Sequence, residues 1–111
     1  MDREYIKTET KGNILIVDIK ANDFNSEVYK ELNDVLDNLG NAKGLVLTST
    51  NDKIFLAGAD LYELNTIIQA GDTKKLEQVI SIGQDTFNRI EDLDITTVAA
   101  VNGICLGGGL E

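Results

Sequence analysis

The sequence contains no histidine and a single cysteine, and these two scarcities exclude several kinds of active site. Without histidine, neither a catalytic triad with an imidazole base nor a histidine-ligated metal site can form within the chain. Cys105 has no partner for an internal disulfide, which is typical of a reducing compartment, and such a cysteine is most often a packing residue. Carboxylates and backbone groups therefore remain as the groups that can carry chemistry.

Positive charge is scarce as well, because 10 lysine and arginine residues stand against 19 acidic residues and give a formal net charge of -9. A nucleic-acid-binding surface would have to oppose that overall field, so we expect no nucleic acid partner. No apolar run approaches the roughly 18 residues that a membrane span needs, and no secretory apolar stretch follows Met1. The sequence therefore predicts an intracellular protein without a membrane span or signal peptide, cytoplasmic in a bacterium.

The length of 111 residues and the 42% share of hydrophobic residues are those of one soluble globular domain. Near the N-terminus, residues 5–10 and 14–19 predict two strands joined by a tight turn at Gly12. Apolar residues then recur at helical spacing over residues 26–39, and Gly40 provides a stop signal. A hairpin followed by a helix is the expected start of the fold.

Strands and helices alternate in the rest of the chain. The apolar run at residues 44–48 is typical of a buried parallel strand, and residues 96–101 show the same pattern. Between them, Asp60 followed by Glu63 predicts a helix start with a cap-and-return pair, in which Asp60 is a cap rather than a catalyst. An apolar stripe predicts a longer helix over residues 73–91. This alternation implies crossovers onto a mostly parallel sheet and hence an α/β fold.

Two glycine-containing loops follow predicted strands, at the end of a parallel sheet where open α/β folds bind ligands. Residues 55–60 form the first loop and contain Gly58, and residues 103–111 form the second and contain three consecutive glycines. Glycine lets the main chain approach a ligand closely, and amides at a helix start lack an internal partner. Two such amides that converge would form an oxyanion hole, whereas a purely structural reading assigns the glycines to turns and close packing.

Two other glycine-rich sites are disfavoured. A phosphate-binding P-loop requires Lys-Ser or Lys-Thr after the glycines, and neither follows Gly109. A dinucleotide-binding fingerprint normally follows the first strand of its unit and is followed by an acidic residue about 20 residues later. The position of the glycines in this chain meets neither condition.

Both loops resemble motifs of one enzyme family. Residues 55–61, Phe-Leu-Ala-Gly-Ala-Asp-Leu, resemble the F-x-A-G-A-D-L/I segment of the crotonase, or enoyl-CoA hydratase/isomerase, superfamily. Residues 98–111, Val-Ala-Ala-Val-Asn-Gly-Ile-Cys-Leu-Gly-Gly-Gly-Leu-Glu, resemble its A-A-V/I-N-G-x-x-x-G-G-G-x-E segment. The resemblance covers nearly the whole chain, and within the superfamily it is nearest to the N-terminal portion of the multifunctional fatty-acid oxidation α subunit.

The resemblance implies a crotonase-like spiral of ββα type with a mostly parallel sheet. Residues 1–111 would form the N-terminal part of one such domain, truncated at the C-terminus. The amides of Ala59 and Gly108 would bind the thioester carbonyl oxygen of an acyl-CoA, where fixed donors stabilise an enolate. Glu111 matches the first of two catalytic glutamates of the hydratases, although a glutamate in the first turn of a helix is also favourable for the helix dipole alone.

The resemblance also implies how substrate and partners are bound. Coenzyme A enters as part of the substrate, so we expect neither a separate cofactor nor a metal site. Tyr62 stands where many relatives have lysine, which puts one contact with a coenzyme A phosphate in doubt. The full-length protein is expected to form a homo-oligomer or a complex with a thiolase-type subunit. The residues expected to bind acyl-CoA are Ala57, Gly58, Ala59, Asp60, Leu61 and Gly108.

Three functions are consistent with the sequence. The first is a 2-enoyl-CoA hydratase of fatty-acid β-oxidation, and the second is another reaction of the same enolate, such as double-bond isomerisation. The third is a non-catalytic acyl-CoA-binding fragment or assembly module. This third function is considered because the second glutamate, the distal acyl pocket and the C-terminal helices of the family would lie beyond Glu111.

Overall fold

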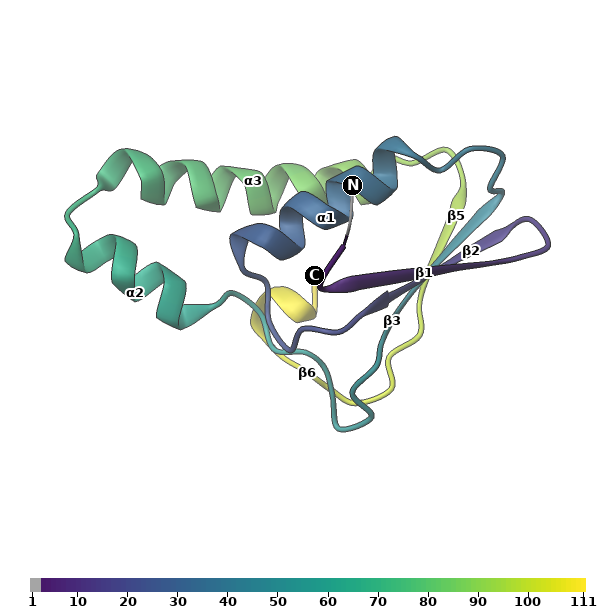
Figure 1. Cartoon of the computed structure of the whole chain (residues 1–111), viewed down its shortest axis with the longest axis horizontal. Helices are drawn as coiled ribbons and strands as arrows, with labels where there is room; N and C mark the ends of the chain where they lie inside the picture. The colour runs from purple at the N-terminus through teal and green to yellow at the C-terminus, as the bar shows by residue number, and fades with distance from the viewer. Residues whose placement is uncertain (1–2) are drawn as a thin grey trace.

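The computed structural model describes residues 3–111 and shows a mixed α/β fold (Figure 1). The strands of the main sheet are β1 (Ile6–Lys11), β2 (Ile14–Ile19), β3 (Gly44–Ser49) and β5 (Thr96–Ala99), in the order β1-β2-β3-β5. The β1 and β2 strands are antiparallel, whereas β2 with β3 and β3 with β5 are parallel. The predicted hairpin and the mostly parallel sheet are therefore confirmed.

Three helices accompany the sheet: α1 (Ser26–Asp37), α2 (Leu61–Gln69) and α3 (Thr73–Glu91). The α1 and α3 helices lie side by side, and α2 and α3 form a helical hairpin that reaches away from the sheet (Figure 1). The α3 helix has the predicted bounds, while α1 ends two residues early because the amide of Asn38 turns back to the Val35 carbonyl at 3.0 Å. No helix within residues 3–111 is long and apolar enough to cross a membrane.

The hydrophobic core lies between α1 and the hairpin–β3 part of the sheet. Val17 and Ile19 of β2 point into it at alternate positions, as a strand with one buried face requires. Val28 and Leu32 of α1 are spaced four residues apart and are fully buried against the same face. The buried carboxylate of Glu31 accepts hydrogen bonds from the backbone amides of the first residue of β1 and of the residue before it. This core fixes the start of α1 relative to the sheet.

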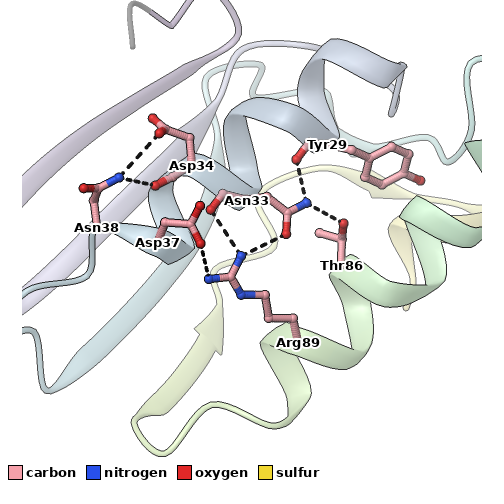
Figure 2. A network of polar contacts seen from close by, with 7 residues as sticks. All are labelled: Tyr29, Asn33, Asp34, Asp37, Asn38, Thr86 and Arg89. Atoms are coloured by element: carbon pink, nitrogen blue, oxygen red, sulfur yellow. Dashed lines mark hydrogen bonds and ion pairs between the residues drawn. The ribbon is translucent and has the colours of Figure 1, made fainter.

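Polar contacts join α1 to α3 (Figure 2). The amide group of Asn33 donates to the Tyr29 carbonyl at 2.9 Å and to the buried hydroxyl of Thr86 at 2.8 Å. The guanidinium of Arg89 donates to both oxygens of Asn33 and forms an ion pair with Asp37. Since α3 buries only Gly83 and Thr86 fully, these bonds contribute to its alignment along α1.

A second, two-stranded parallel sheet was not predicted. It pairs β4 (Ile54–Leu56) with β6 (Ile104–Cys105), and β6 is followed by the short 3₁₀ helix η1 (Gly107–Gly109). Strands of three and two residues are too short for side-chain alternation to reveal them. Their pairing has a direct consequence for function, because each strand leads into one of the two glycine-containing loops.

The burial predicted for the last strand of the main sheet was wrong. All four residues of β5 are exposed, even though the strand pairs with β3 as expected. Apolar composition identified the strand, but burial depends on what covers its faces. Within the described residues, the core that packs against α1 draws its main-sheet residues from β1, β2 and β3 and includes none from β5.

Candidate active site

The first glycine-containing loop is bound to the segment that precedes α1. The amide of Phe24 donates to the Gly58 carbonyl at 2.7 Å, and the amide of Asp60 donates to the Phe24 carbonyl at 3.0 Å. Phe24 and Ala59 thereby form an isolated parallel bridge. Gly58 adopts a φ of 99°, a conformation that favours glycine strongly. The chain is fixed on both sides of Ala59.

The start of α2 combines a predicted cap with an unpredicted contact. The Asp60 carboxylate accepts a hydrogen bond from the Glu63 amide at 3.1 Å, which confirms Asp60 as the N-cap. The predicted return bond from Glu63 to the Asp60 amide is absent, since that amide is bonded to Phe24. The Glu63 carboxylate instead accepts bonds from the amide of Ser26, at 3.1 and 3.2 Å, and from its hydroxyl, at 2.7 Å.

The second glycine-containing loop lies directly against the first. The amide of Leu106 donates to the Leu56 carbonyl at 3.0 Å and thereby extends the pairing of β4 with β6. Gly109 then passes so close to Leu56 that a Cβ atom at this position would overlap the Leu56 carbonyl group. The thiol of Cys105 donates to the Gly109 carbonyl at 2.9 Å, which agrees with a structural role for this cysteine.

The two loops converge at Gly58 and Gly108. A Cβ atom at Gly58 would lie 3.0 Å from the amide nitrogen of Gly108, and one at Gly108 would lie 3.6 Å from the Gly58 Cα. Within residues 3–111, neither the Ala59 amide nor the Gly108 amide donates a hydrogen bond. Glu111 borders the same point, because its Oε2 lies 3.7 Å from the Cβ position of Gly108. The three residues predicted to be catalytic are therefore neighbours.

A cavity of about 1110 Å³ opens beside this point. Its size exceeds the range of roughly 300–1,000 Å³ usual for ligand pockets. Apolar side chains of the sheet, α1 and α3 form most of its wall, and the candidate residues Ala59, Gly108 and Glu111 also line it. The charged residues that line it are Asp60, Glu63, Glu91 and Glu111. A ligand in this cavity would thus meet a mostly apolar wall that also carries four carboxylates.

An aromatic cluster forms the part of the wall nearest the converging loops. The ring of Tyr29 stacks on Phe24 with centroids 5.1 Å apart, and Phe87 meets both rings edge-on at 5.3 and 6.0 Å. A Cβ atom at Gly83 would lie 3.0 Å from the Tyr29 hydroxyl, so the glycine in α3 makes room for this ring. The Cε2 atom of Phe87 lies 3.9 Å from the Cβ position of Gly108, which connects the cluster to the loop.

Two side chains near the site titrate above their usual range. Burial raises the pKa of Tyr29, with further increases from the negative charges of Glu111 and Glu63. Burial also raises the pKa of Asp23, to which the charges of Asp60 and Glu63 add, while a backbone hydrogen bond opposes the rise. Glu63, in the first turn of α2, therefore adds to the rise of both pKa values.

The other predicted binding residues lie along the first loop. The amide of Ala57 donates to the Asn22 carbonyl at 2.7 Å, so its backbone belongs to the same fixed segment. The side chains of Leu61 and Tyr62 are exposed at the start of α2. No group of three or more potential metal-ligating side chains occurs within residues 3–111. Neither the aromatic cluster nor the contact between Ser26 and Glu63 was predicted, because each brings together residues far apart in the sequence.

Comparison with known families agrees with this arrangement. The family model described as enoyl-CoA hydratase/isomerase matches residues 10–111, which is nearly the whole chain. The chain belongs to the enoyl-CoA hydratase/isomerase family. Membership confirms the resemblance expected from the two motifs and makes the chain part of an enzyme family of the crotonase type.

Curated relatives and solved structures support this family membership. The chain is 43% identical over 104 residues to the fatty acid oxidation complex subunit alpha of Shewanella halifaxensis, covering 88% of this chain and 14% of the relative. It is 41% identical over 94 residues to the same subunit of Psychrobacter cryohalolentis, covering 82% and 13%. The chain thus spans about a seventh of these relatives.

Among solved structures, an enoyl-CoA hydratase of Geobacillus kaustophilus matches with a TM-score of 0.88 at 25% identity, over 99% of this chain and 42% of that one. An enoyl-CoA hydratase of Bacillus anthracis matches with a TM-score of 0.82 at 28% identity, over 96% and 43%. These similarities confirm the crotonase fold, of which the chain spans less than half.

Proposed function

We propose that the chain supplies the oxyanion hole and one acid/base carboxylate of a 2-enoyl-CoA hydratase. The observation that carries this proposal is the convergence of the two loops, with the Gly108 amide nitrogen 3.0 Å from the Cβ position of Gly58. A thioester oxygen bound by the amides of Ala59 and Gly108 would bring the reacting carbons near Glu111. The apolar cavity beside these groups suits an acyl chain.

In the proposed reaction, water adds across the double bond of a 2-enoyl-CoA. Glu111 accepts a proton as the water oxygen bonds to the β carbon, and the electron pair of the double bond moves toward the thioester oxygen. The amides of Ala59 and Gly108 stabilise the resulting enolate, and a single donor of this kind contributes about 2.7–4 kcal/mol. Protonation of the α carbon re-forms the carbonyl and gives a 3-hydroxyacyl-CoA.

A second carboxylate is part of this proposal. The hydratases that the sequence resembles divide the two proton transfers between a pair of glutamates, and Glu111 matches the first of them. Asp60 and Glu63 line the same cavity, but their carboxylates accept hydrogen bonds at the start of α2 and α1. Following the same resemblance, we assign the second role to a carboxylate that lies beyond Glu111.

The test is Glu111→Gln in the polypeptide that naturally contains this chain, assayed by loss of the conjugated thioester absorbance of crotonyl-CoA. We expect kcat to fall by about 10²–10⁴-fold, because the amide cannot transfer the proton. Binding of butyryl-CoA should persist, since the oxyanion donors are unchanged. Glu77→Gln, at an exposed position of α3, is the matched control. Unchanged turnover in Glu111→Gln would exclude the assigned role.

Isomerisation of 3-enoyl-CoA is the alternative reaction of the same enolate. It is favoured by the presence of one carboxylate, that of Glu111, among the groups nearest to Gly108. Isomerisation requires one base to move a proton between two carbons, whereas hydration also requires a water molecule. Identification of the product formed from each substrate separates the two reactions, and absence of both would favour the non-catalytic binding module.

We further propose fatty-acid β-oxidation as the process and a thiolase-type subunit as the partner. The proposal is supported by relatives that are named fatty acid oxidation complex subunit alpha. It also assigns the protein to the cytoplasm of a bacterium. Size-exclusion chromatography with the thiolase-type protein of the same organism tests the assembly, and separate elution of the two proteins would contradict it.

A further inference from the structure

The contact between Ser26 and Glu63 joins the start of α1 to the start of α2. Both carboxylate oxygens of Glu63 accept from the Ser26 amide, at 3.2 and 3.1 Å, and one of them accepts from the Ser26 hydroxyl at 2.7 Å. A charged acceptor strengthens such bonds, and the N-terminus of α1 favours a negative charge. The two residues are 37 positions apart, so this contact is a tertiary one.

Burial of apolar side chains contributes little to fixing the position of α2. Ile67 is the one buried residue of this helix, while Leu61 and Tyr62 in its first turn are 75% and 84% exposed. A helix with so little buried surface requires other contacts to fix its N-terminus. Within residues 3–111, the contact with Ser26 supplies the tertiary hydrogen bonds at this end, apart from the bond between the Asp60 amide and Phe24.

The start of α2 is also the end of the loop that presents Ala59. Glu63 donates its amide to the Asp60 carboxylate at 3.1 Å, and Asp60 follows Ala59 directly. At the other end of the contact, Ser26 begins the helix that contains the fully buried Val28. Beside the bonds of Phe24 on both sides of Ala59, a second connection therefore runs from the hydrophobic core to the Ala59 amide through Ser26, Glu63 and Asp60.

We propose that Glu63 is a positioning residue that, through its contact with Ser26, fixes the Ala59 amide in the geometry of an oxyanion donor. This role rests on the proposed enolate-forming function of the site. Glu63 does not exchange a proton with the substrate in this proposal, because both of its carboxylate oxygens are occupied as acceptors. Displacement of a catalytic group by about 1 Å costs up to roughly 100-fold in rate.

The experiment compares four variants of the full polypeptide. Glu63→Ala removes the whole contact, Glu63→Gln keeps one oxygen acceptor, and Ser26→Ala removes the hydroxyl bond alone. Glu77→Ala is the matched control on the exposed side of α3. With crotonyl-CoA as substrate, we expect kcat to fall about 10- to 100-fold in Glu63→Ala. The loss should decrease through Glu63→Gln and Ser26→Ala, and KM should stay within about threefold because ground-state binding is unchanged.

Two further measurements distinguish positioning from general stabilisation. Hydrogen–deuterium exchange at the Asp60 amide, which is bonded to the Phe24 carbonyl, should accelerate at least about tenfold in Glu63→Ala if the loop opens. Acetoacetyl-CoA, whose enolate carries negative charge at the thioester oxygen, should lose more affinity than butyryl-CoA. A purely structural role would weaken the two ligands equally.

The proposal is overturned if Glu63→Ala retains both the wild-type kcat and the wild-type exchange rate. It is equally overturned if kcat falls while exchange at Asp60 is unchanged, since Glu63 would then act by another route. Should the wild-type protein convert neither crotonyl-CoA nor a 3-enoyl-CoA, the proposed function fails. The exchange rates and the ligand comparison would still decide whether the contact positions the loop.

Discussion

Residues 3–56, the core segment, and residues 96–111, the loop segment, are held in place by different forces. Every buried hydrophobic residue of the described chain except Ile67 lies between Ile6 and Leu56. The loop segment buries none, and it is attached by backbone hydrogen bonds such as those from Ile104 to Lys53 and from Leu106 to Leu56. The core segment thus supplies stability, whereas the loop segment depends on close backbone approach.

This difference explains how the candidate site is assembled. The Ala59 amide follows directly from the core segment, while Gly108 and Glu111 belong to the loop segment. Catalysis through both amides requires the two segments to keep their relative position to within a fraction of an ångström. Changes in the core segment should therefore affect folding first, and changes in the loop segment should affect turnover first.

The largest stability effect is expected in the core segment. Leu32→Ala should lower the free energy of unfolding by about 2–5 kcal/mol, because Leu32 is 1% exposed and its truncation leaves a cavity. Val98→Ala in β5, where the side chain is 51% exposed, should change it by less than about 0.5 kcal/mol. Urea denaturation of both variants measures the two values, and similar losses would remove the distinction between the segments.

The next effect concerns turnover. Gly109→Ala should reduce the proposed hydratase activity about 100-fold, since its Cβ would overlap the Leu56 carbonyl and the loop would have to move with the Gly108 amide. Gly12→Ala is the control, because Gly12 has a φ of 61° but no atom within 4 Å of its Cβ position. This control should lower the free energy of unfolding by about 1 kcal/mol and leave kcat unchanged. Wild-type activity in Gly109→Ala would show that the loops are not tightly apposed.

The same difference between the segments limits what sequence could predict. The α1 and α3 helices were predicted to within two residues, because an apolar stripe and a cap determine a helix locally. The β4 and β6 strands were missed, since their pairing depends on contacts between short segments far apart in the sequence. The burial of β5 was wrong for a related reason, because composition does not specify what packs against a strand.

The candidate site was predictable to a similar extent. The two loop motifs predicted the glycines and Glu111 as site residues, and the structure brings Gly58, Gly108 and Glu111 together. The carboxylate of Glu63 was expected to return to its own helix, yet it binds Ser26, because the Asp60 amide already has an acceptor in Phe24. Local patterns identified the groups of the site, whereas the contacts that position them are tertiary.

The smallest expected effect is a change in the pKa of Tyr29, which tests whether the core segment and the loop segment are in contact. The pKa of Tyr29 is raised first by burial, then by the charge of Glu111 from the loop segment. Glu111→Gln should therefore lower the pKa of Tyr29, though not to the ordinary value near 10, because burial remains. The difference between ultraviolet titrations with and without Tyr29→Phe isolates this phenol, and Glu77→Gln should leave its pKa unchanged.

The raised pKa of Tyr29 also has a consequence for stability. The phenol ionises more easily in the unfolded chain than in the folded one. The stability that it contributes is therefore fully present below about pH 10 and is lost as the pH rises through the folded-state pKa. Glu111→Gln should make this alkaline loss smaller, because it narrows the difference between the folded and unfolded pKa values. An unchanged alkaline unfolding profile would mean that Glu111 does not approach the aromatic cluster, and the loop segment would then be positioned independently of α1.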